Sequence, residues 1–172
     1  AAKLPWNLTL NDGLEAANNS NNGYSFITMG VDWGGGGGGS IKRKRNQLIV
    51  EGGTTSFTVV SIQGFRPGIV NPDVIYAERF PNDMTPDAEA RRIMELFWSF
   101  RCNLLGHDFG GAGAIRETLL LQAGMPQDRI MPCAYTHMPT KPIVEFKGAD
   151  IVRPRNYYSV DKARSLALLC AV

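Results

Sequence analysis

Two segments of the chain share a pattern in which an apolar run ends in an aspartate that is followed by an aromatic residue and glycines. The first reads G-V-D-W-G-G-G around Asp32, and the second reads L-G-H-D-F-G-G-A-G around Asp108. Apolar runs that stop at glycines are typical of buried strands that end in a turn. In open α/β sheets, sites form outside the carboxyl ends of the strands, so two such aspartates face one crevice if their strands are neighbours. The pattern favours an α/β sheet with its candidate site at one edge.

The order of the expected elements supports a mixed sheet. Three strands come first, and strands then alternate with helices, which gives the order β-β-β-α-β-α-β-α. We therefore predict an α/β fold with an antiparallel three-strand meander, parallel strands beside it and helices on both faces. The expected strands are 24–33, 54–63, 74–80, 103–108 and 130–135, and the expected helices begin at Pro86, after Gly113, and at Ser159 or Asp161.

The expected domain organisation is simple. Residues 1–23 are polar and Asn-rich towards their end, so we expect a lead-in or linker segment there, with a short helix on Leu10, Leu14 and Ala17. Residues 24–172 are expected to form one domain. The apolar residues of the last helix are still in period at Val172, which predicts that this domain is truncated at its C-terminus.

Composition excludes several classes of protein. The formal net charge is only +2, which argues against a polybasic wrapper of nucleic acid. Three widely spaced cysteines without a C-x-x-C pair argue against a disulfide scaffold and a zinc site. No apolar run approaches the roughly 18 residues of a membrane span. We therefore expect a soluble protein of the cytoplasm.

The paired aspartates predict a divalent-metal site. Two carboxylates held close together repel each other, and Mg²⁺ or Mn²⁺ relieves that repulsion while accepting oxygen ligands. Two such ions can activate a water and stabilise a leaving oxygen in phosphoryl transfer. Asp32 and Asp108 are therefore the candidate catalytic and metal-binding residues. Each taken alone could also be an ordinary turn or helix-cap aspartate. His107 is expected to be packed or hydrogen-bonded rather than a ligand, because strand neighbours point to opposite faces.

The two aspartate motifs, the meander between them and the helix after Asp108 together resemble the nuclease domain of phage terminase large subunits, a member of the RNase H-like fold. The resemblance covers roughly residues 24–172. It implies an RNase H-like sheet and a metal-dependent endonuclease that cuts concatemeric double-stranded viral DNA with two Mg²⁺ or Mn²⁺ ions. It also implies an upstream ATPase domain, a portal and a small terminase subunit as partners, and the cytoplasm of an infected host cell as the location.

The family has a triad of acids, of which Asp32 matches the first and Asp108 the second. Its third acid lies beyond a helix that resembles residues 157–172, where this chain has already ended. We expect the third ligand either to lie beyond a truncated end or to be replaced by Asp150, Asp161 or Glu78.

Basic residues and glycines complete the candidate site. Four consecutive basic residues follow the glycine run, and a second basic stretch lies near the C-terminus. Both are candidates to bind DNA phosphates without reading base sequence, and an ordinary solvated basic loop is the alternative for each. Glycines beside each aspartate would let a phosphate backbone approach. The later glycines are expected to form a flexible insertion, which is either a DNA-contacting loop or an engineered linker. The candidate DNA-binding residues are Lys42, Arg43, Lys44, Arg45, Arg153, Arg155 and Lys162, and the candidate backbone-approach glycines are Gly34, Gly35, Gly110 and Gly111.

Two alternatives remain open. An actin-like or sugar-kinase-type ATP-binding lobe would use D-W-G-G and D-F-G-G-A-G as phosphate loops, although this chain supplies one lobe at most. A non-cutting RNase H-like scaffold would bind nucleic acid without hydrolysing it. The glycines from Gly34 to Gly39 imitate a P-loop, but Ser40-Ile41 stands where Lys-Ser/Thr is required, so we expect no P-loop nucleotide binding by this chain.

Overall fold

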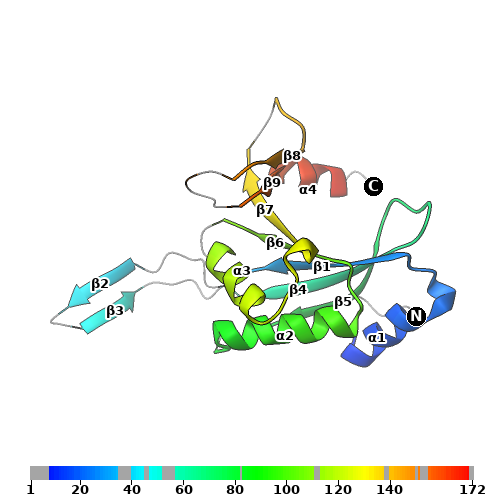
Figure 1. Cartoon of the computed structure of the whole chain (residues 1–172), viewed down its shortest axis with the longest axis horizontal. Coiled ribbons are helices and arrows are strands. Elements are labelled where there is room, and N and C mark those ends of the chain that lie inside the picture. Colours follow the sequence, from blue (N-terminus) through cyan, green and yellow to red (C-terminus); the bar gives the residue numbers. More distant parts are fainter. Residues whose placement is uncertain are drawn as a thin grey trace.

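The computed structural model of the chain describes residues 8–34, 40–44, 47–51, 57–81, 83–110, 113–137, 140–149, 151 and 155–170. Most of the strands belong to one sheet. They are β1 (Phe26–Asp32), β4 (Val59–Phe65), β5 (Asp73–Arg79), β6 (Leu104–Asp108), β7 (Ile130–Thr136), β8 (Val144–Lys147) and β9 (Tyr157–Asp161). The seven strands lie in the order β5-β4-β1-β6-β7-β9-β8 (Figure 1).

The sheet is mixed. Strands β1, β6, β7 and β9 run parallel to one another, whereas the β1–β4, β4–β5 and β8–β9 pairs are antiparallel. The predicted α/β class with a mixed sheet is confirmed. Because the four parallel strands share a direction, their carboxyl ends meet at one edge of the sheet.

Within the described residues, four α-helices accompany the sheet. Helix α2 begins where the sequence predicts it, because the Thr85 side chain accepts a hydrogen bond from the Ala88 N–H and Pro86 takes the first helical position. Gly124, with a φ of 98°, follows the end of the next helix in the left-handed region that glycine tolerates. The helices are α1 (Leu10–Asn18), α2 (Pro86–Ser99), α3 (Gly113–Gln122) and α4 (Lys162–Cys170), with short 3₁₀ turns η2 (Ser20–Asn22) and η3 (Gln127–Arg129).

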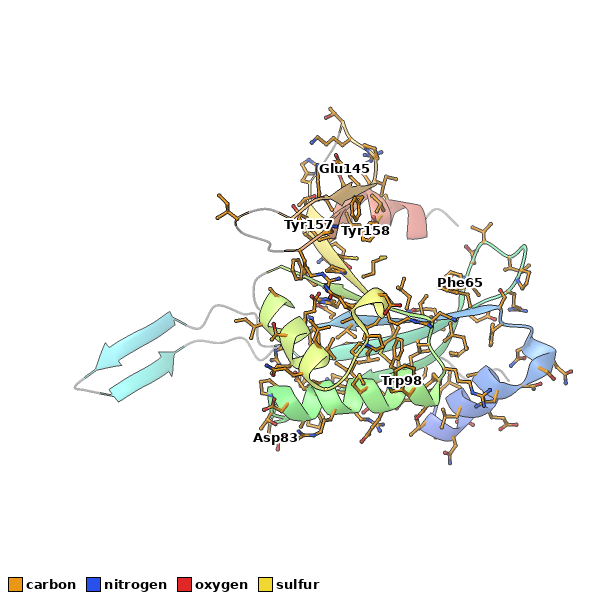
Figure 2. All side chains as sticks on the ribbon, in the orientation of Figure 1. Phe65, Asp83, Trp98, Glu145, Tyr157 and Tyr158 are labelled. Carbon is orange, nitrogen blue, oxygen red and sulfur yellow. The ribbon has the colours of Figure 1, made fainter. Side chains whose placement is uncertain are left out.

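The core lies between one face of the sheet and helices α1, α2 and α3, and side chains fill this layer (Figure 2). Along β1, Met29 and Val31 are buried on the helix-covered face, whereas Gly30 and Asp32 belong to the opposite face. Helix α4 begins on that opposite face, where the Lys162 ammonium lies 5.4 Å from the centre of the Tyr135 ring. The two faces therefore differ in function: one builds the core and the other is open for a site.

Helix α1 shares this core. Leu10 and Leu14 pack against the main cluster of buried side chains. Gly13 lies so close to β5 that an added Cβ would come 2.9 Å from the Ile75 carbonyl oxygen. The segment expected to lead into the domain therefore contributes to its packing.

The region after β1 differs from the expected flexible insertion. Residues Ser40–Lys44 form β2 and residues Gln47–Glu51 form β3, and the two strands pair as an antiparallel hairpin. Figure 1 shows this hairpin standing apart from the seven-stranded sheet. The second strand of that sheet, expected from Thr54, begins at Val59.

The C-terminal part differs as well. Of the two expected openings of the last helix, Ser159 and Asp161, the structure has Asp161, which caps the helix that begins at Lys162. Residues Tyr157–Asp161 themselves form strand β9, which was not expected. Strand β8 at the sheet edge was not expected. In the part of the chain that the structure describes, no helix combines the length and apolar character needed to cross a membrane.

Candidate metal-binding cleft

Asp32 and Asp108 occupy equivalent places at the ends of adjacent parallel strands. The register pairs Gly30 with Gly106 and Val31 with His107, so the two aspartates follow at the same level. Both line one open cleft of about 410 Å³ on the sheet face opposite helices α1 to α3. The crevice expected from the sequence is therefore present. The cleft is lined by Gly30, Val31, Asp32, Val59, Ser61, Gly106, His107, Asp108, Met131, Cys133, Tyr135 and Lys162.

The two carboxylates have different surroundings. Asp32 is exposed, and among the described residues its side chain has neither a hydrogen bond nor an ion pair. Asp108 is half-buried, and its Oδ1 accepts a hydrogen bond from the Gly110 N–H at 2.7 Å. That bond is the local turn contact typical of an aspartate before a glycine. The second oxygen of Asp108 and the whole Asp32 carboxylate remain available to a ligand in the cleft.

Negative charge concentrates at this edge and acts on its neighbours. Burial raises the pKa of the Cys133 thiol to about 11, and the Asp108 carboxylate adds to the increase. Burial also raises the pKa of the Tyr135 hydroxyl, with smaller contributions from Cys133, Asp108 and Asp32. Both aspartates therefore act on one side chain at the end of β7, as expected for groups that face the same space.

The residues present fit a hard divalent cation. Carboxylate oxygens are the ligands that Mg²⁺ prefers, and Mg²⁺ is commonly held by one or two carboxylates with waters and substrate phosphates completing its shell. The unpartnered Asp32 carboxylate supplies such a donor, and the glycine floor beside it leaves room for other ligands. Among residues 8–34 and the other described ranges, no group of three or more His, Cys, Asp or Glu side chains gathers for a metal.

Of the candidates for a third acid, the two that the structure describes, Glu78 and Asp161, do not line the cleft. Glu78 bonds to Arg92 at 2.9 Å and to the Tyr76 hydroxyl at 2.8 Å, on the side that packs against α2. Asp161 lies at the same sheet edge, but it is fully buried and its Oδ1 accepts a hydrogen bond from the Arg164 N–H at 3.0 Å. It therefore caps α4. Asp150 lies outside the described residues.

The candidate DNA-binding residues also differ in whether they line the cleft. Lys162 lines the cleft, over the exposed Tyr135 ring. Arg155 does not: it pairs with the buried Glu117 at 2.6 Å and donates to the Ile130 carbonyl, so its position is structural and the expected DNA contact is corrected. Lys42, Arg43 and Lys44 belong to β2, in the hairpin that stands apart from the sheet. Arg45 and Arg153 lie outside the described residues.

The glycines near the two aspartates have different structural roles. The Gly34 N–H donates to the Thr58 hydroxyl at 2.9 Å, so this buried residue fixes the chain after β1 rather than receiving a ligand. Gly110 binds the Asp108 carboxylate, as described above. Gly30 and Gly106 line the cleft without adding a side chain to it, and neither was among the predicted approach glycines. The predicted approach glycines Gly35 and Gly111 lie outside the described residues.

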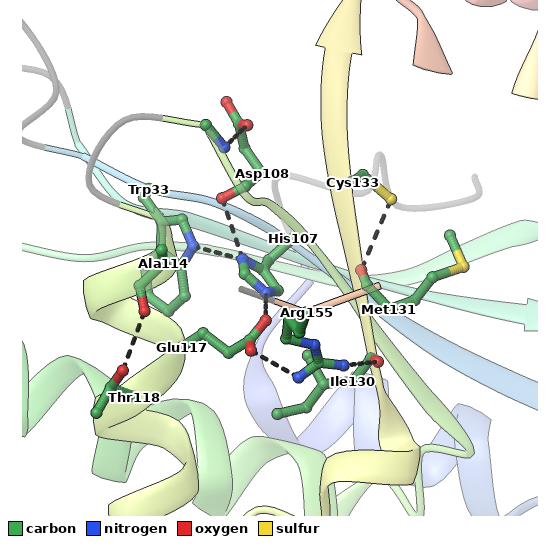
Figure 3. A network of polar contacts seen from close by, with 11 residues as sticks. Trp33, His107, Asp108, Ala114, Glu117, Thr118, Ile130, Met131, Cys133 and Arg155 are labelled. Atoms are coloured by element: carbon green, nitrogen blue, oxygen red, sulfur yellow. Dashed lines mark hydrogen bonds and ion pairs between the residues drawn. The ribbon is translucent and has the colours of Figure 1, made fainter. Parts of the chain in front are cut away.

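A chain of polar contacts lies next to Asp108 and runs from Trp33 through His107 and Glu117 to Arg155 (Figure 3). The Trp33 indole N–H donates to His107 Nδ1 at 3.0 Å, and His107 Nε2 lies 2.8 Å from Glu117 Oε2. Glu117 in turn pairs with Arg155. The expectation that His107 is hydrogen-bonded is confirmed. Glu117 was missed, although its spacing one turn from both Gly113 and Leu120 places an acid on the apolar side of α3.

A second buried cluster anchors the chain just after Asp32. Thr58 accepts from the Gly34 N–H and donates its hydroxyl to Glu89 Oε1 at 3.0 Å. Arg116 forms an ion pair with the other oxygen of Glu89, and its guanidinium also lies 5.8 Å from the centre of the Trp33 ring. The chain just after Asp32 is therefore held at Gly34 by Thr58, which precedes β4, and by Arg116 of α3, with Glu89 of α2 bound to both.

Comparison of the chain with protein-family models, with curated proteins and with solved structures finds no match.

Proposed function

We propose that this chain is an RNase H-like nuclease domain, similar to that of phage terminase large subunits, that hydrolyses double-stranded DNA with Mg²⁺ or Mn²⁺. One observation carries the proposal: Asp32 and Asp108 end neighbouring parallel strands at the same level of one open cleft. Two carboxylates at such a strand edge can serve as ligands for the ions that act in two-metal phosphodiester hydrolysis. In its full setting the domain would act beside an ATPase domain, a portal and a small terminase subunit in an infected host cell.

The strand order supports the RNase H-like assignment. The antiparallel strands β5, β4 and β1 lie beside the parallel strands β6 and β7, which agrees with the meander and parallel strands expected from the resemblance. The hairpin β2–β3 is then an insertion between the first two strands of the meander. Strands β8 and β9 extend the sheet beyond β7.

Each cleft residue has a role in this proposal. Asp32 and Asp108 hold the divalent ions, which when bound activate a water and stabilise the leaving oxygen. Gly30 and Gly106 add no side chain beside the carboxylates, which leaves space for the sugar–phosphate backbone. Lys162, in the same cleft, supplies a positive charge for a phosphate next to the cleavage position.

The test is plasmid cleavage with Mn²⁺ by the wild-type chain and by D32N and D108N. Replacing a carboxylate by an amide of the same shape removes a charged ligand, and we expect each variant to lose cleavage about 100-fold. D128N, which changes an exposed aspartate in η3, is the matched control and should cleave as the wild type does. A chelator should abolish cleavage by the wild type and by the control.

The alternatives give different results in the same experiment. Salt-sensitive DNA binding that survives a chelator, without cleavage under any metal, would replace the nuclease by a non-cutting scaffold. Tight ATP binding in calorimetry would favour the ATP-binding lobe. Full cleavage by both asparagine variants would refute the role of the cleft.

A further inference from the structure

The residues next to the two aspartates are joined on the far side of the sheet. Trp33 follows Asp32 and His107 precedes Asp108, and the indole N–H of Trp33 donates to His107 Nδ1 at 3.0 Å. Successive residues of a strand point to opposite faces, so the bonded pair lies beneath the sheet and the carboxylates lie above it. One hydrogen bond thus connects the same two strand ends that carry the two like charges.

This bond is part of a well-buried chain of contacts. The His107 side chain is 0% exposed and that of Glu117 is 4% exposed. His107 Nδ1 lies 3.0 Å from the Trp33 indole nitrogen, which can only donate, and 3.0 Å from the Asp108 carbonyl oxygen, which can only accept. When the proton of the imidazole is on Nε2 and is donated to Glu117 Oε2 at 2.8 Å, Nδ1 accepts from the indole. Arg155 holds the other oxygen of Glu117 at 2.6 Å. The orientation of the imidazole is therefore fixed from α3 and from the segment before β9.

The hydrogen bond between Trp33 and His107 counteracts the repulsion between the two carboxylates. Two carboxylates on adjacent strand ends repel each other, which favours separation of the ends. The cleft face offers little packing against that separation, because the residues next to the aspartates on this face of the two strands are Gly30 and Gly106. The hydrogen bond between Trp33 and His107 opposes separation from below.

We propose that His107 is a positioning residue that, through Trp33, sets the separation of Asp32 and Asp108 so that both carboxylates reach one divalent cation. The inference rests on the metal site of the proposed function. It adds that the spacing of the acids is fixed by a bond on the opposite face, and that Glu117 and Arg155 support that bond. Residues in this supporting shell commonly change metal affinity 10-fold to 100-fold when they are replaced.

The test is Mn²⁺ binding by the full chain, followed by the EPR signal of free Mn²⁺. W33F removes only the indole donor, and we expect about a tenfold weaker affinity for Mn²⁺. In plasmid cleavage, W33F should need about tenfold more Mn²⁺ for half-maximal rate and keep its rate at saturating Mn²⁺. W98F, which changes an exposed tryptophan on α2, is the matched control and should bind as the wild type does.

Two variants of His107 separate positioning from folding. H107N keeps an acceptor oxygen near the position of Nδ1, whereas H107L keeps none, and both lose the contact with Glu117. Both should lower the urea midpoint of unfolding, but only H107L should bind Mn²⁺ about tenfold more weakly.

The outcomes are distinct. Equal Mn²⁺ affinity of W33F and the wild type, or of H107L and H107N, overturns the positioning role and leaves the metal site in place. A wild-type chain that binds no Mn²⁺ overturns the metal site and this inference together.

Discussion

Gly30 on β1 and Gly106 on β6 are direct neighbours in the parallel register, and together they form the floor of the cleft next to Asp32 and Asp108. An added Cβ at Gly106 would meet nothing within 4 Å, so the glycine is not required by packing. At Gly30 an added Cβ would come 3.1 Å from the Ser61 hydroxyl. The open floor is therefore a feature of the cleft that substitution at Gly106 can test without disturbing the core.

We predict that G106V folds normally and loses most of its DNA cleavage. A β-branched residue suits a strand, so the free energy of unfolding should change by less than about 1 kcal/mol. The valine side chain would occupy the space where the phosphate backbone is proposed to approach. Cleavage should fall progressively from G106A to G106V, measured beside urea unfolding curves. Wild-type cleavage by G106V would show that the substrate does not use this floor.

A close approach fixes the position of Asp108. An added Cβ at Gly113, in the first turn of α3, would lie 2.0 Å from the Asp108 carbonyl oxygen, and backbone cannot yield to such a contact without moving. We predict that G113A lowers the free energy of unfolding by about 1–3 kcal/mol or more and weakens Mn²⁺ binding. G148A, at an exposed glycine with nothing within 4 Å, should change stability by less than about 0.5 kcal/mol. Equal stability of the two variants would contradict the tight packing of α3 on Asp108.

The ion pair between Arg116 and Glu89 should stabilise the fold more than the ion pair between Arg92 and Glu78, which lies nearer the surface. Replacing Arg116 by methionine leaves the buried Glu89 carboxylate without its cation, and we predict a loss of about 3–5 kcal/mol in the free energy of unfolding. Replacing Arg92, whose pair with Glu78 is partly solvated, should cost about 1 kcal/mol. Urea unfolding of R116M and R92M compares the two pairs. A smaller loss for R116M than for R92M would show that Glu89 finds another partner.

The Cys133 thiol in the cleft should make the free energy of unfolding depend on pH. Burial and the Asp108 charge raise the pKa of Cys133 from 9.0 to about 11, so the folded state favours the protonated thiol. The resulting stability is fully present below about pH 9 and is lost as the pH rises through about 11. We predict that the free energy of unfolding falls across this range and falls less steeply in C133A. At pH 8 the folded chain should hold about 100-fold less Cys133 thiolate than an ordinary thiol, which lowers its alkylation rate.

The variant D108N separates the two causes of this shift. Without the carboxylate, the pKa of Cys133 should move part of the way back, and alkylation near pH 9 should speed up. A Cys133 that titrates near 9 in the folded wild-type chain would contradict its burial at the floor of the cleft.

Local signals in the sequence identified the parts that depend on neighbouring residues. Thr85 and Pro86 predict the start of α2, and the apolar run before Asp108 predicts β6, because capping and strand periodicity are local properties. Strand β9 was missed because it passes directly into α4 without a turn. The pairing of β2 with β3 was missed because the glycines before β2 and the basic residues within it are typical of loops.

Residues whose roles depend on distant partners could not be assigned from the sequence. Arg155 looks like a DNA-binding residue in its basic stretch, yet its position is set by Glu117, which is far away in the chain. Glu89 and Arg116 are similar, since each belongs to an ordinary amphipathic helix and only the packing of α2 on α3 brings them together. The pair of aspartates was visible because each lies at the end of its own strand, and the sheet register then aligns them.

The most direct measurement is an anomalous difference map from crystals of the chain soaked in Mn²⁺. If Asp32 and Asp108 hold a divalent cation, the map will show a peak in the cleft within coordination distance of oxygens from both carboxylates, and D108N crystals will lack it. A soaked wild-type crystal with no peak between the two aspartates, or with manganese only at other carboxylates, would contradict the metal site and the proposed nuclease function with it.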